Sequence, residues 1–524
     1  MSIGVLARTR RLSSTLPAPL PPLARYIVLP FTAAGLTLLL SSILGLLEGD
    51  PYSYRFMAWG AGYVALSAAW VLATRPSYSL TREGAFVLVA FSWLATPLAS
   101  ALPIAYELHI PFIDAWFESI SGYTTTGLSV FSGGVDRDYG VYIPRVEELP
   151  ATVLWWRAVS EWLGGFGVVV LFYTIARLGG LPAHLVGAAE GRFERIEPSI
   201  AKSLQALMIL YLVLTALGTS LLYAAGMSLS DALYHTMTGL ATGGFSTHSE
   251  SIGYYRSPVV EAATIVVMVL GASNFADLYA VLRGVRRRYS GEIPGLLGLI
   301  AFNTLVGVLV LYALNWSPHT PLREALFDLV SAHSGTGFGI SDLSHAPGAY
   351  KFLLVLAMIT GGSAFSTTGG IKVYRVSIVL KSVAWSVRET VYGRSYVSVK
   401  RVGGYAIDES LLQSAIAVIL LFTLTLIAGA TALMILLPGT SVVDALFEAQ
   451  SALCTVGLSV GITSAAAPWT VKAVLMVLMT LGRLEVIGFI YAATAAAKLL
   501  KSMASTKPRK TPEPLRLPRR TYPY

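Results

Sequence analysis

The chain carries little charge and almost no sulfur chemistry. Charged residues make up 13% of its 524 positions, against about 25% in soluble domains. Its one cysteine, Cys454, excludes an internal disulfide and any site built from several thiolates. The sequence contains no nucleotide-binding phosphate loop and no H-E-x-x-H motif. We therefore expect neither an enzyme nor a cofactor-binding protein.

Long apolar runs fill most of the chain. Hydrophobic residues account for 54% of it, and its mean hydropathy is +0.64. Runs of about 18 or more apolar residues indicate transmembrane helices, so the sequence predicts an all-α polytopic membrane protein with ten transmembrane spans. They are expected near 26–47, 55–74, 83–104, 151–178, 203–226, 258–283, 293–314, 350–382, 409–437 and 468–500.

The formal charge of +9 has a topological explanation. Most Lys and Arg residues fall before the first span, after the last one, or in alternate loops, whereas the opposite loops carry acids such as Asp50 and Asp136. By the positive-inside rule the basic side is cytoplasmic. We expect a protein of the cell (plasma) membrane with both termini cytoplasmic. Its basic face would attract anionic membrane lipid, and no nucleic-acid partner is expected.

One short phrase occurs four times, with an acid, an alanine, a bulky apolar residue and an aromatic ring. The acids of the four copies are Asp114, Asp231, Glu324 and Asp444. Thirteen positions after each acid stands a glycine, hereafter the key glycine: Gly127, Gly244, Gly337 and Gly457. A fourfold repeat of this kind predicts four span–pore helix–span units around a pseudo-fourfold pore. The units are expected at 81–185, 200–290, 292–400 and 408–500, after an N-terminal pair of spans in 1–80 and before a basic cytoplasmic tail at 501–524.

The segment between acid and glycine is too short to cross a bilayer of about 30 Å. Irregular backbone at membrane depth survives only inside protein or beside a water-filled path, so the four loops are expected to line one. Rings of backbone carbonyls there can replace the water shell of K⁺. The predicted filter residues are Thr125, Thr126, Gly127, Thr242, Gly243, Gly244, Gly335, Thr336, Gly337, Thr455, Val456 and Gly457. A metal ion, K⁺, is expected at these positions only. The third strand departs from the others, because Gly335 stands where they have Thr.

Several polar residues near the repeats allow two interpretations. Glu118, Asp328 and Glu448 share one repeat position, with His235 in the second copy. They could form a solvated ring of acids that concentrates cations, or they could hold the pore helices in place. Glu161 and the glycines that follow it are expected to form a helix contact. His333 has no partner for a metal site and is predicted to be structural.

The second span of the third unit contains the stretch TGGSAFSTTGGIK. Its glycines, Gly361, Gly362, Gly369 and Gly370, are poor helix formers, so an unwound, movable gate is predicted, the alternative being tight helix packing through small residues. Asn274 and Asp277 could contact this gate or cap polar groups. Arg483 lies in the last span, where a charge is costly and usually functional. It is expected to face the path or the gate, or else to form a structural ion pair.

These motifs resemble the membrane subunit of the Trk/Ktr/HKT superfamily of potassium transporters over roughly residues 25–500. The extra N-terminal spans make the chain similar to the Trk (TrkH-like) branch. The resemblance implies a homodimer with one pore per subunit, a gate at Gly361–Gly370 with Lys372 at its cytoplasmic end, and Arg483 near the pore. It also implies a cytoplasmic TrkA-like nucleotide-binding regulatory subunit. That subunit would dock on the basic inner face, with Arg283, Arg286, Arg287, Arg288 and the 381–401 loop as contacts.

The expected function is K⁺ uptake down the electrochemical gradient, in a channel-like manner. An inside-negative potential supplies about 2.3 kcal/mol per charge per 100 mV. The alternative is a K⁺/H⁺ or K⁺/Na⁺ symporter. It requires a titratable or ion-binding group along the path, and the spans contain few of them.

Overall fold

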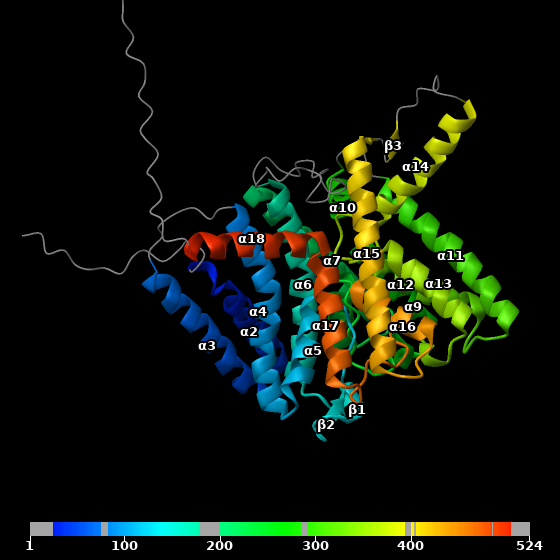
Figure 1. Ribbon diagram of the computed structural model, residues 1–524. Coiled ribbons are helices and arrows are strands. Elements are labelled where there is room, and N and C mark those ends of the chain that lie inside the picture. Colours follow the sequence, from blue (N-terminus) through cyan, green and yellow to red (C-terminus); the bar gives the residue numbers. More distant parts are fainter. Residues whose placement is uncertain are drawn as a thin grey trace, which may run out of the picture.

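Figure 1 shows a computed structural model of the chain, which describes residues 25–74, 82–177, 200–284, 291–392, 400–402, 405–484 and 486–504. Helices dominate these residues. Strands form two antiparallel hairpins, β1 (Ser132–Val135) with β2 (Tyr142–Arg145) and β3 (Arg401–Val402) with β4 (Tyr405–Ala406). The low charge and long apolar runs therefore produce the helical fold that the sequence predicts.

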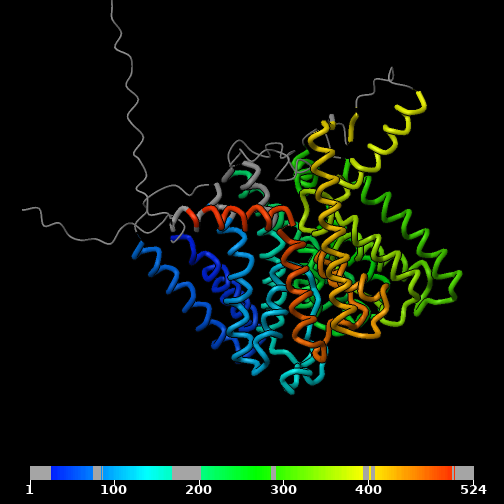
Figure 2. The backbone as a smooth tube through the Cα atoms, in the orientation of Figure 1, coloured from blue at the N-terminus to red at the C-terminus, as the bar shows by residue number. Residues whose placement is uncertain are grey.

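Two helices, α2 (Leu29–Leu47) and α3 (Tyr52–Ala73), precede the repeats and pack against each other. Their backbones approach each other closely at two glycines. A Cβ added at Gly35 would lie only 2.9 Å from the carbonyl oxygen of Gly60. This pair lies at one flank of the molecule, and α11 and α14 lie at the opposite flank (Figure 2).

The remaining helices repeat one pattern, a long helix, a short helix, a loop and a second long or broken helix. We call each set a quarter. Quarter one is α4 (Arg82–Leu108), α5 (Phe112–Tyr123) and α6 (Ala151–Arg177); quarter two is α7 (Ile200–Ala224), α8 (Leu229–Leu240), α9 (Pro258–Ala272) and α10 (Phe275–Leu282). Quarter three is α11 (Glu292–Leu314), α12 (Pro321–Ser334), α13 (Gly348–Thr360) and α14 (Val373–Tyr392); quarter four is α15 (Glu409–Leu436), α16 (Val442–Leu453), α17 (Trp469–Leu484) and α18 (Val486–Ala504). Short 3-10 helices lie at Val146–Glu148, Ser251–Tyr255 and Leu343–His345.

Six helices of the described part are long and apolar enough to cross a membrane: α2, α3, α4, α7, α11 and α15. The count rises to eight if each of two bent pairs is one span. The helices in two of the expected spans, 258–283 and 468–500, are broken: α9 and α10 meet at 106° and α17 and α18 at 92°. The first break follows from Asn274, whose side chain accepts hydrogen bonds from the N–H groups of Ala276 and Asp277 and so starts a new helix. In Figure 1, α18 lies across the ends of its neighbours.

The four short helices α5, α8, α12 and α16 have 12 to 14 residues. At about 1.5 Å per residue they span roughly 18–21 Å. Side chains of Ser228, Thr320 and Ser441 cap three of them, with an acid in the first turn of all four that complements the helix dipole.

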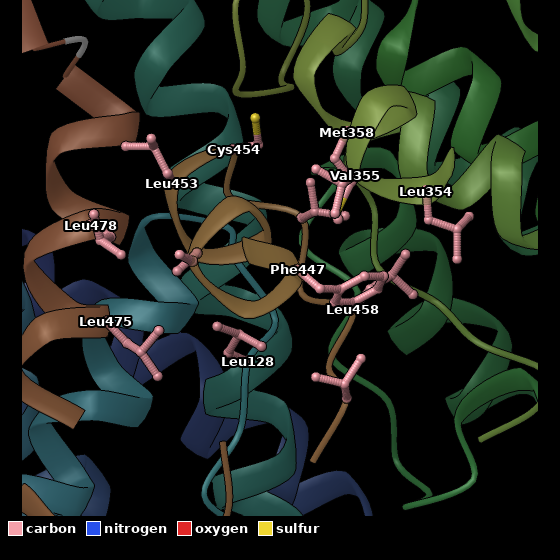
Figure 3. Close-up of a cluster of buried hydrophobic side chains, with 14 of the residues drawn as sticks. Leu128, Leu354, Val355, Met358, Phe447, Leu453, Cys454, Leu458, Leu475 and Leu478 are labelled. Atoms are coloured by element: carbon pink, nitrogen blue, oxygen red, sulfur yellow. The ribbon is translucent and has the colours of Figure 1, made fainter. Parts of the chain in front are cut away.

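The short helices are buried by apolar packing. Figure 3 shows α16 between α13, which carries Val355 and Met358, and α17, which carries Leu475 and Leu478. Phe447 of α16 is fully buried in this cluster. Such packing holds a helix that is too short to be stable alone.

Candidate ion filter and gate

The chain makes the same turn after each short helix. In quarter one the N–H of Thr126 donates to the carbonyl of Ser121 at 2.8 Å. The equivalent bonds are Gly243 to Thr238 at 2.9 Å, Thr336 to Ser331 at 3.1 Å and Val456 to Ser451 at 2.8 Å. Two residues before each key glycine the backbone is left-handed, with φ of 52°, 54°, 67° and 51° at Thr125, Thr242, Gly335 and Thr455. Gly335, which stands where the other quarters have Thr, therefore has the same backbone conformation as those threonines.

The four key glycines form a closed ring. They have φ between 82° and 95°, a conformation natural to glycine. Each also lies against a carbonyl oxygen of the next quarter. An added Cβ would lie 1.9 Å from that oxygen at Gly127, Gly244 and Gly337 and 2.2 Å from it at Gly457; the oxygens belong to Gly243, Thr336, Val456 and Thr126. All twelve predicted filter residues therefore meet in one place, and no side chain fits at the key glycines.

A cavity of about 930 Å³ opens onto the ring. All four key glycines line it. Basic side chains, including Arg256 and Arg323, stand in its wall beside Glu250 and Asp342. The cavity connects the ring with one face of the molecule, and its wall carries charges of both signs.

The acids at the shared repeat position do not line this cavity. Glu118 and Glu448 are fully buried, and each accepts hydrogen bonds from the loop after its own key glycine. Glu118 is bound by the Ser129 hydroxyl at 2.9 Å and the Val130 N–H at 3.1 Å, and Glu448 by their counterparts Ser459 and Val460. His235 contacts Ser246 in the same way at 2.9 Å. The geometry does not fit a solvated ring of acids. These residues hold parts of the pore in place, as the second interpretation expects, although they bind the loops after the short helices.

Asp328 in quarter three differs from the other three. It is bound by the Tyr350 hydroxyl of α13 at 3.0 Å. It is fully buried as well, so it anchors a neighbouring helix instead of its own loop.

Ion pairs among the described residues join three of the four junctions between quarters. Lys472 of α17 lies 2.5 Å from Asp114 of α5 and 2.6 Å from Asp136. Lys351 of α13 lies 2.7 Å from Asp444 of α16. At the third junction the polarity is reversed, and Glu261 of α9 binds Arg323 of α12. Each pair connects the helix that follows the loop in one quarter (α17, α13 or α9) with the start of the short helix in the next quarter.

The junction of quarters one and two is built differently. Arg157 of α6 is fully buried, binds Glu118 at 2.8 Å and donates to the carbonyl of Ser246 at 2.7 Å. Nearer the surface, Glu147 accepts hydrogen bonds from the N–H and hydroxyl of Ser249. Burial raises the pKa of Glu147, but these hydrogen bonds outweigh burial, so its pKa lies below the usual value.

The predicted interruption of the third quarter is present. Regular helix is absent between Thr360 and Val373, both within the described residues. Positive φ values occur at Gly361 (61°), Gly370 (77°) and Lys372 (76°). We call residues 361–372 the candidate gate loop. The Lys372 ammonium folds back onto Thr368 and is buried, so it belongs to the loop itself.

The candidate gate loop lies directly against the base of the ring. The Thr367 hydroxyl is 2.9 Å from the carbonyl of Leu240, the last residue of α8, and 3.2 Å from the Thr242 hydroxyl. A Cβ added at Gly369 would lie 2.3 Å from the carbonyl of Cys454. The loop thus touches the ends of two short helices at once.

Arg483 reaches the same loop from quarter four. Its guanidinium donates to the carbonyl of Thr367 at 2.7 Å and to that of Gly164 in quarter one at 3.2 Å. It is 3% exposed and makes no ion pair within the part of the chain that the structure describes. The neighbouring acid Glu485 lies outside the described residues. Of the expected placements, contact with the loop is the one observed.

Two further hydrogen bonds connect the candidate gate loop with the starts of α11 and α10. The N–H of Ala364 donates to the Glu292 carboxylate at 2.7 Å, and the Phe275 N–H donates to the carbonyl of Phe365 at 2.8 Å. Both partners begin helices, α11 and α10. Asn274 therefore caps α10 and places Phe275 next to the loop.

Sequence reasoning missed Thr367, Lys472 and Lys351. Thr367 sits in a run of small polar residues, and only the fold singles it out. The two lysines sit near the starts of their helices, about 14 to 15 positions after their key glycines, a regularity that could have drawn attention to them. His333 binds Asn303 at 2.7 Å and Thr360 at 2.8 Å, consistent with its predicted structural part. No cluster of His, Cys, Asp or Glu that could hold a metal occurs among the described residues.

Comparison with known proteins gives related results by sequence and by structure. The chain is 30% identical over 458 residues to an uncharacterized cation transporter of Methanocaldococcus jannaschii, covering 86% of this chain and 91% of the relative. It is 31% identical to the Trk system potassium uptake protein TrkH of Halomonas elongata, covering 78% and 84%.

The crystal structure of the potassium transporter TrkH from Vibrio parahaemolyticus has the same fold. It matches with a TM-score of 0.77 at 27% identity, over 90% of this chain and 97% of that one. The family described as TrkH, cation transport protein, matches residues 53–316 and 314–506. These matches span nearly the whole chain, which therefore belongs to the TrkH family of membrane cation transport proteins.

Proposed function

We propose that this protein takes up K⁺ across the cell membrane through a carbonyl-lined filter and an intramembrane gate. The observation that carries the proposal is the closed ring of key glycines. Four loops of the same backbone conformation meet head to tail, each with a glycine against the next loop's carbonyl. Relatives of similar length are named potassium uptake proteins.

Backbone carbonyls suit this task because they replace the water shell of a monovalent cation without adding a fixed charge that would trap it. The four short helices support the same function. Their C-terminal ends, which carry partial negative charge, finish within a few residues of the ring at Tyr123, Leu240, Ser334 and Leu453. Each side of the path thus supplies both carbonyls and a helix end favourable to cations.

The proposal includes ten spans, eight of them in the quarters around the ring and two in the N-terminal pair. The six long helices and the two bent pairs account for eight. α6, with 27 residues, and α13 with its continuation into α14 supply the other two. With the basic loops inside, the 930 Å³ cavity faces out, both termini are cytoplasmic, and the plasma membrane is the site of action.

The candidate gate loop, residues 361–372, is the barrier of the proposed path. Its support is its position, since it contacts the ends of α8 and α16 directly under the ring and is held there by Arg483. An ion leaving the filter would meet this loop before the cytoplasm. Displacement of the loop would open the path.

We further propose a homodimer that works with a cytoplasmic, TrkA-like nucleotide-binding subunit. A regulator needs a way to reach the gate from the inside. The loop is bonded to the starts of α10 and α11, and the stretch of sequence between these helices begins at Arg283. Arg286, Arg287 and Arg288 of the predicted docking face lie outside the described residues. The expectation of a loop at 381–401 is wrong in its first part, because residues 381–392 belong to helix α14; residues 393–399 lie outside the described residues.

The test is cation flux into proteoliposomes that contain the purified protein. With an inside-negative potential, Rb⁺ should enter in preference to Na⁺, and without a potential or gradient it should not accumulate. Entry that ignores the potential and requires a pH or Na⁺ gradient would instead establish a symporter. Equal Rb⁺ and Na⁺ entry under every condition would refute the selective filter.

A second measurement addresses the gate. Shortening the segment from Gly361 to Gly370 should raise Rb⁺ flux while leaving the Rb⁺/Na⁺ ratio unchanged, because the ring stays intact. An unaltered rate in a correctly folded variant would remove the gate from this loop.

A further inference from the structure

The filter strand of quarter two lies beside a buried carboxylate that comes from another quarter, that of Glu161. Glu161 lies on α6 of quarter one and is fully buried. Both of its carboxylate oxygens lie 3.3 Å from the N–H of Phe245, the residue after the key glycine Gly244. A Cβ added at Gly243 would lie 2.3 Å from the carboxyl carbon of Glu161. The carboxylate therefore occupies the space that a side chain at position 243 would fill.

The other quarters have a side chain in that position. Thr126 and Thr336 stand immediately before their key glycines. Their hydroxyls pair with hydroxyls two residues earlier, Thr124 at 2.8 Å and Ser334 at 2.7 Å. Quarter four has the bulky Val456, which is buried. Only quarter two combines a glycine with an alanine, Ala241, at these two positions, so neither position supplies a side chain that could support the strand from behind.

The helix that carries Glu161 is held tightly in place. One turn further along α6, a Cβ added at Gly164 would lie 2.2 Å from the carbonyl of Tyr123, and one at Gly165 would lie 3.0 Å from Ala241. The helix contact expected from these glycines is therefore made with the ends of α5 and α8. A carboxylate on this face has a fixed position relative to the second strand.

Nearby cations leave Glu161 available for this contact. Arg157, one turn earlier on α6, binds Glu118 and the carbonyl of Ser246. Arg483 binds the carbonyls of Thr367 and Gly164. Glu161 makes no ion pair with any residue in the described ranges, and its hydrogen bond there comes from Phe245.

We infer that Glu161 is a positioning residue for ion selection, whose side chain supports the second filter strand from behind in place of the side chain that Gly243 lacks. It acts by filling the space at Gly243 and by accepting the hydrogen bond of Phe245. The inference rests on the proposed function, because it concerns the selectivity of the proposed filter. It also explains the double glycine of quarter two as the counterpart of an acid contributed by quarter one.

The test is a double-mutant cycle read out as the Rb⁺/Na⁺ flux ratio of the full-length protein in proteoliposomes. Glu161→Ala removes both the filling and the acceptor, and should lower the ratio at least about fivefold, as expected for loss of a buried hydrogen bond. Gly243→Ala forces the carboxylate aside and should lower the ratio as well. In the double variant the new methyl group occupies the vacated space, so the combined loss should be smaller than the product of the two single losses.

Glu161→Gln separates positioning from charge. Its amide oxygen can accept from Phe245, so the ratio should stay within about twofold of the unmodified protein. A fall as large as that of Glu161→Ala would overturn the hydrogen-bonding assignment. Gly62→Ala is the matched control for Gly243→Ala, because a Cβ at Gly62 of α3 meets nothing within 4 Å.

The outcomes separate this inference from the proposed function. If the unmodified protein fails to prefer Rb⁺, the proposed function fails. If it prefers Rb⁺ and the two substitutions act independently, or Gly243→Ala leaves the ratio unchanged, the role of Glu161 is refuted. Gly243→Ala alone can still refute that role if Glu161→Ala does not fold.

Discussion

The ring of key glycines and the layer beneath it, which consists of the candidate gate loop and Arg483, differ in symmetry. In the ring, all four quarters have the same hydrogen bond, a left-handed backbone two residues before the key glycine, and the same contact with the next carbonyl. In the layer beneath, one quarter supplies the loop at 361–372 and another supplies Arg483. The ring is repetitive and the layer is not.

The difference follows from what each level has to do. An ion that has lost its water needs ligands on all sides, so every quarter must contribute equivalent carbonyls. A single path, by contrast, is closed by a single obstruction, and three quarters are free to omit it. Symmetry is therefore expected where coordination occurs and is unnecessary where flow is stopped. The following predictions break or sharpen this contrast.

The largest effect is expected at the junction that closes the ring between quarters four and one. Lys472→Met would leave Asp114 and Asp136 as buried carboxylates without their cation, and all three side chains are at most 1% exposed. Loss of one partner of a buried pair costs about 3–5 kcal/mol. Thermal unfolding in detergent should show this loss, whereas Lys501→Met, at an exposed position of α18, should not. Equal melting of the two variants would show that this pair does not hold the ring.

The next effect concerns the ring itself. Gly127→Ser places a side chain where a Cβ would lie 1.9 Å from the carbonyl of Gly243, so the first two strands must separate. The Rb⁺/Na⁺ flux ratio should fall by at least about tenfold, a change of roughly 1.4 kcal/mol in relative barrier height. Gly298→Ser on α11, where a Cβ meets nothing within 4 Å, is the control. An unchanged ratio in Gly127→Ser would exclude Gly127 from the filter.

The layer beneath should respond in rate and not in selectivity. Arg483→Gln weakens the hold on the carbonyl of Thr367, which is 2.7 Å from the guanidinium. Rb⁺ flux should rise several-fold, by about fivefold for a loss of roughly 1 kcal/mol of stabilisation of the closed loop, at a constant Rb⁺/Na⁺ ratio. Arg55→Gln, at an arginine whose side chain is 64% exposed, serves as control. A change in the ratio without a change in rate would contradict the separation of the two levels.

The last prediction concerns Gly335, which stands where the other three quarters have Thr, two residues before the key glycine. Gly335 has φ of 67°, and an added Cβ would meet Thr368 only at an ordinary 3.6 Å. Gly335→Ala should therefore cost only the left-handed strain, about 1–2 kcal/mol, seen as a lower unfolding temperature with near-normal selectivity. Gly295→Ala in α11, with the same 3.6 Å clearance and no left-handed backbone, should not destabilise the protein. Equal stability of both variants would show that Gly335 carries no conformational advantage.

The repeat was predictable because each copy keeps its acid, its aromatic residue and its glycine at constant spacing. The interruption at Gly361–Gly370 was predictable too, since four glycines in a span weaken a helix. The breaks after α9 and α17 were not, because each pair of helices is together apolar enough to pass for one span, despite the polar residues at the bends. At the first of them the new helix depends on a single cap by Asn274.

The roles of the buried charges were the hardest to predict. Glu118, Glu448 and Glu161 occupy similar apolar surroundings in the sequence, and sequence alone left open whether the first two line the outer mouth or hold the pore helices. Two of them have a partner from a distant segment: Arg157 lies 39 residues from Glu118, and Phe245 lies 84 residues from Glu161. Only chain folding brings such pairs into contact.

The sequence by itself determined a helical membrane protein, the fourfold repeat and the four glycines, because hydropathy and spacing are local properties of the chain. The tertiary structure decided how the quarters join: which carbonyl lies against each key glycine, which lysine reaches which acid, and which loop lies under the ring. Those contacts depend on the relative placement of helices that are far apart in the chain. That placement is set by close packing of whole helix surfaces, which no single segment encodes.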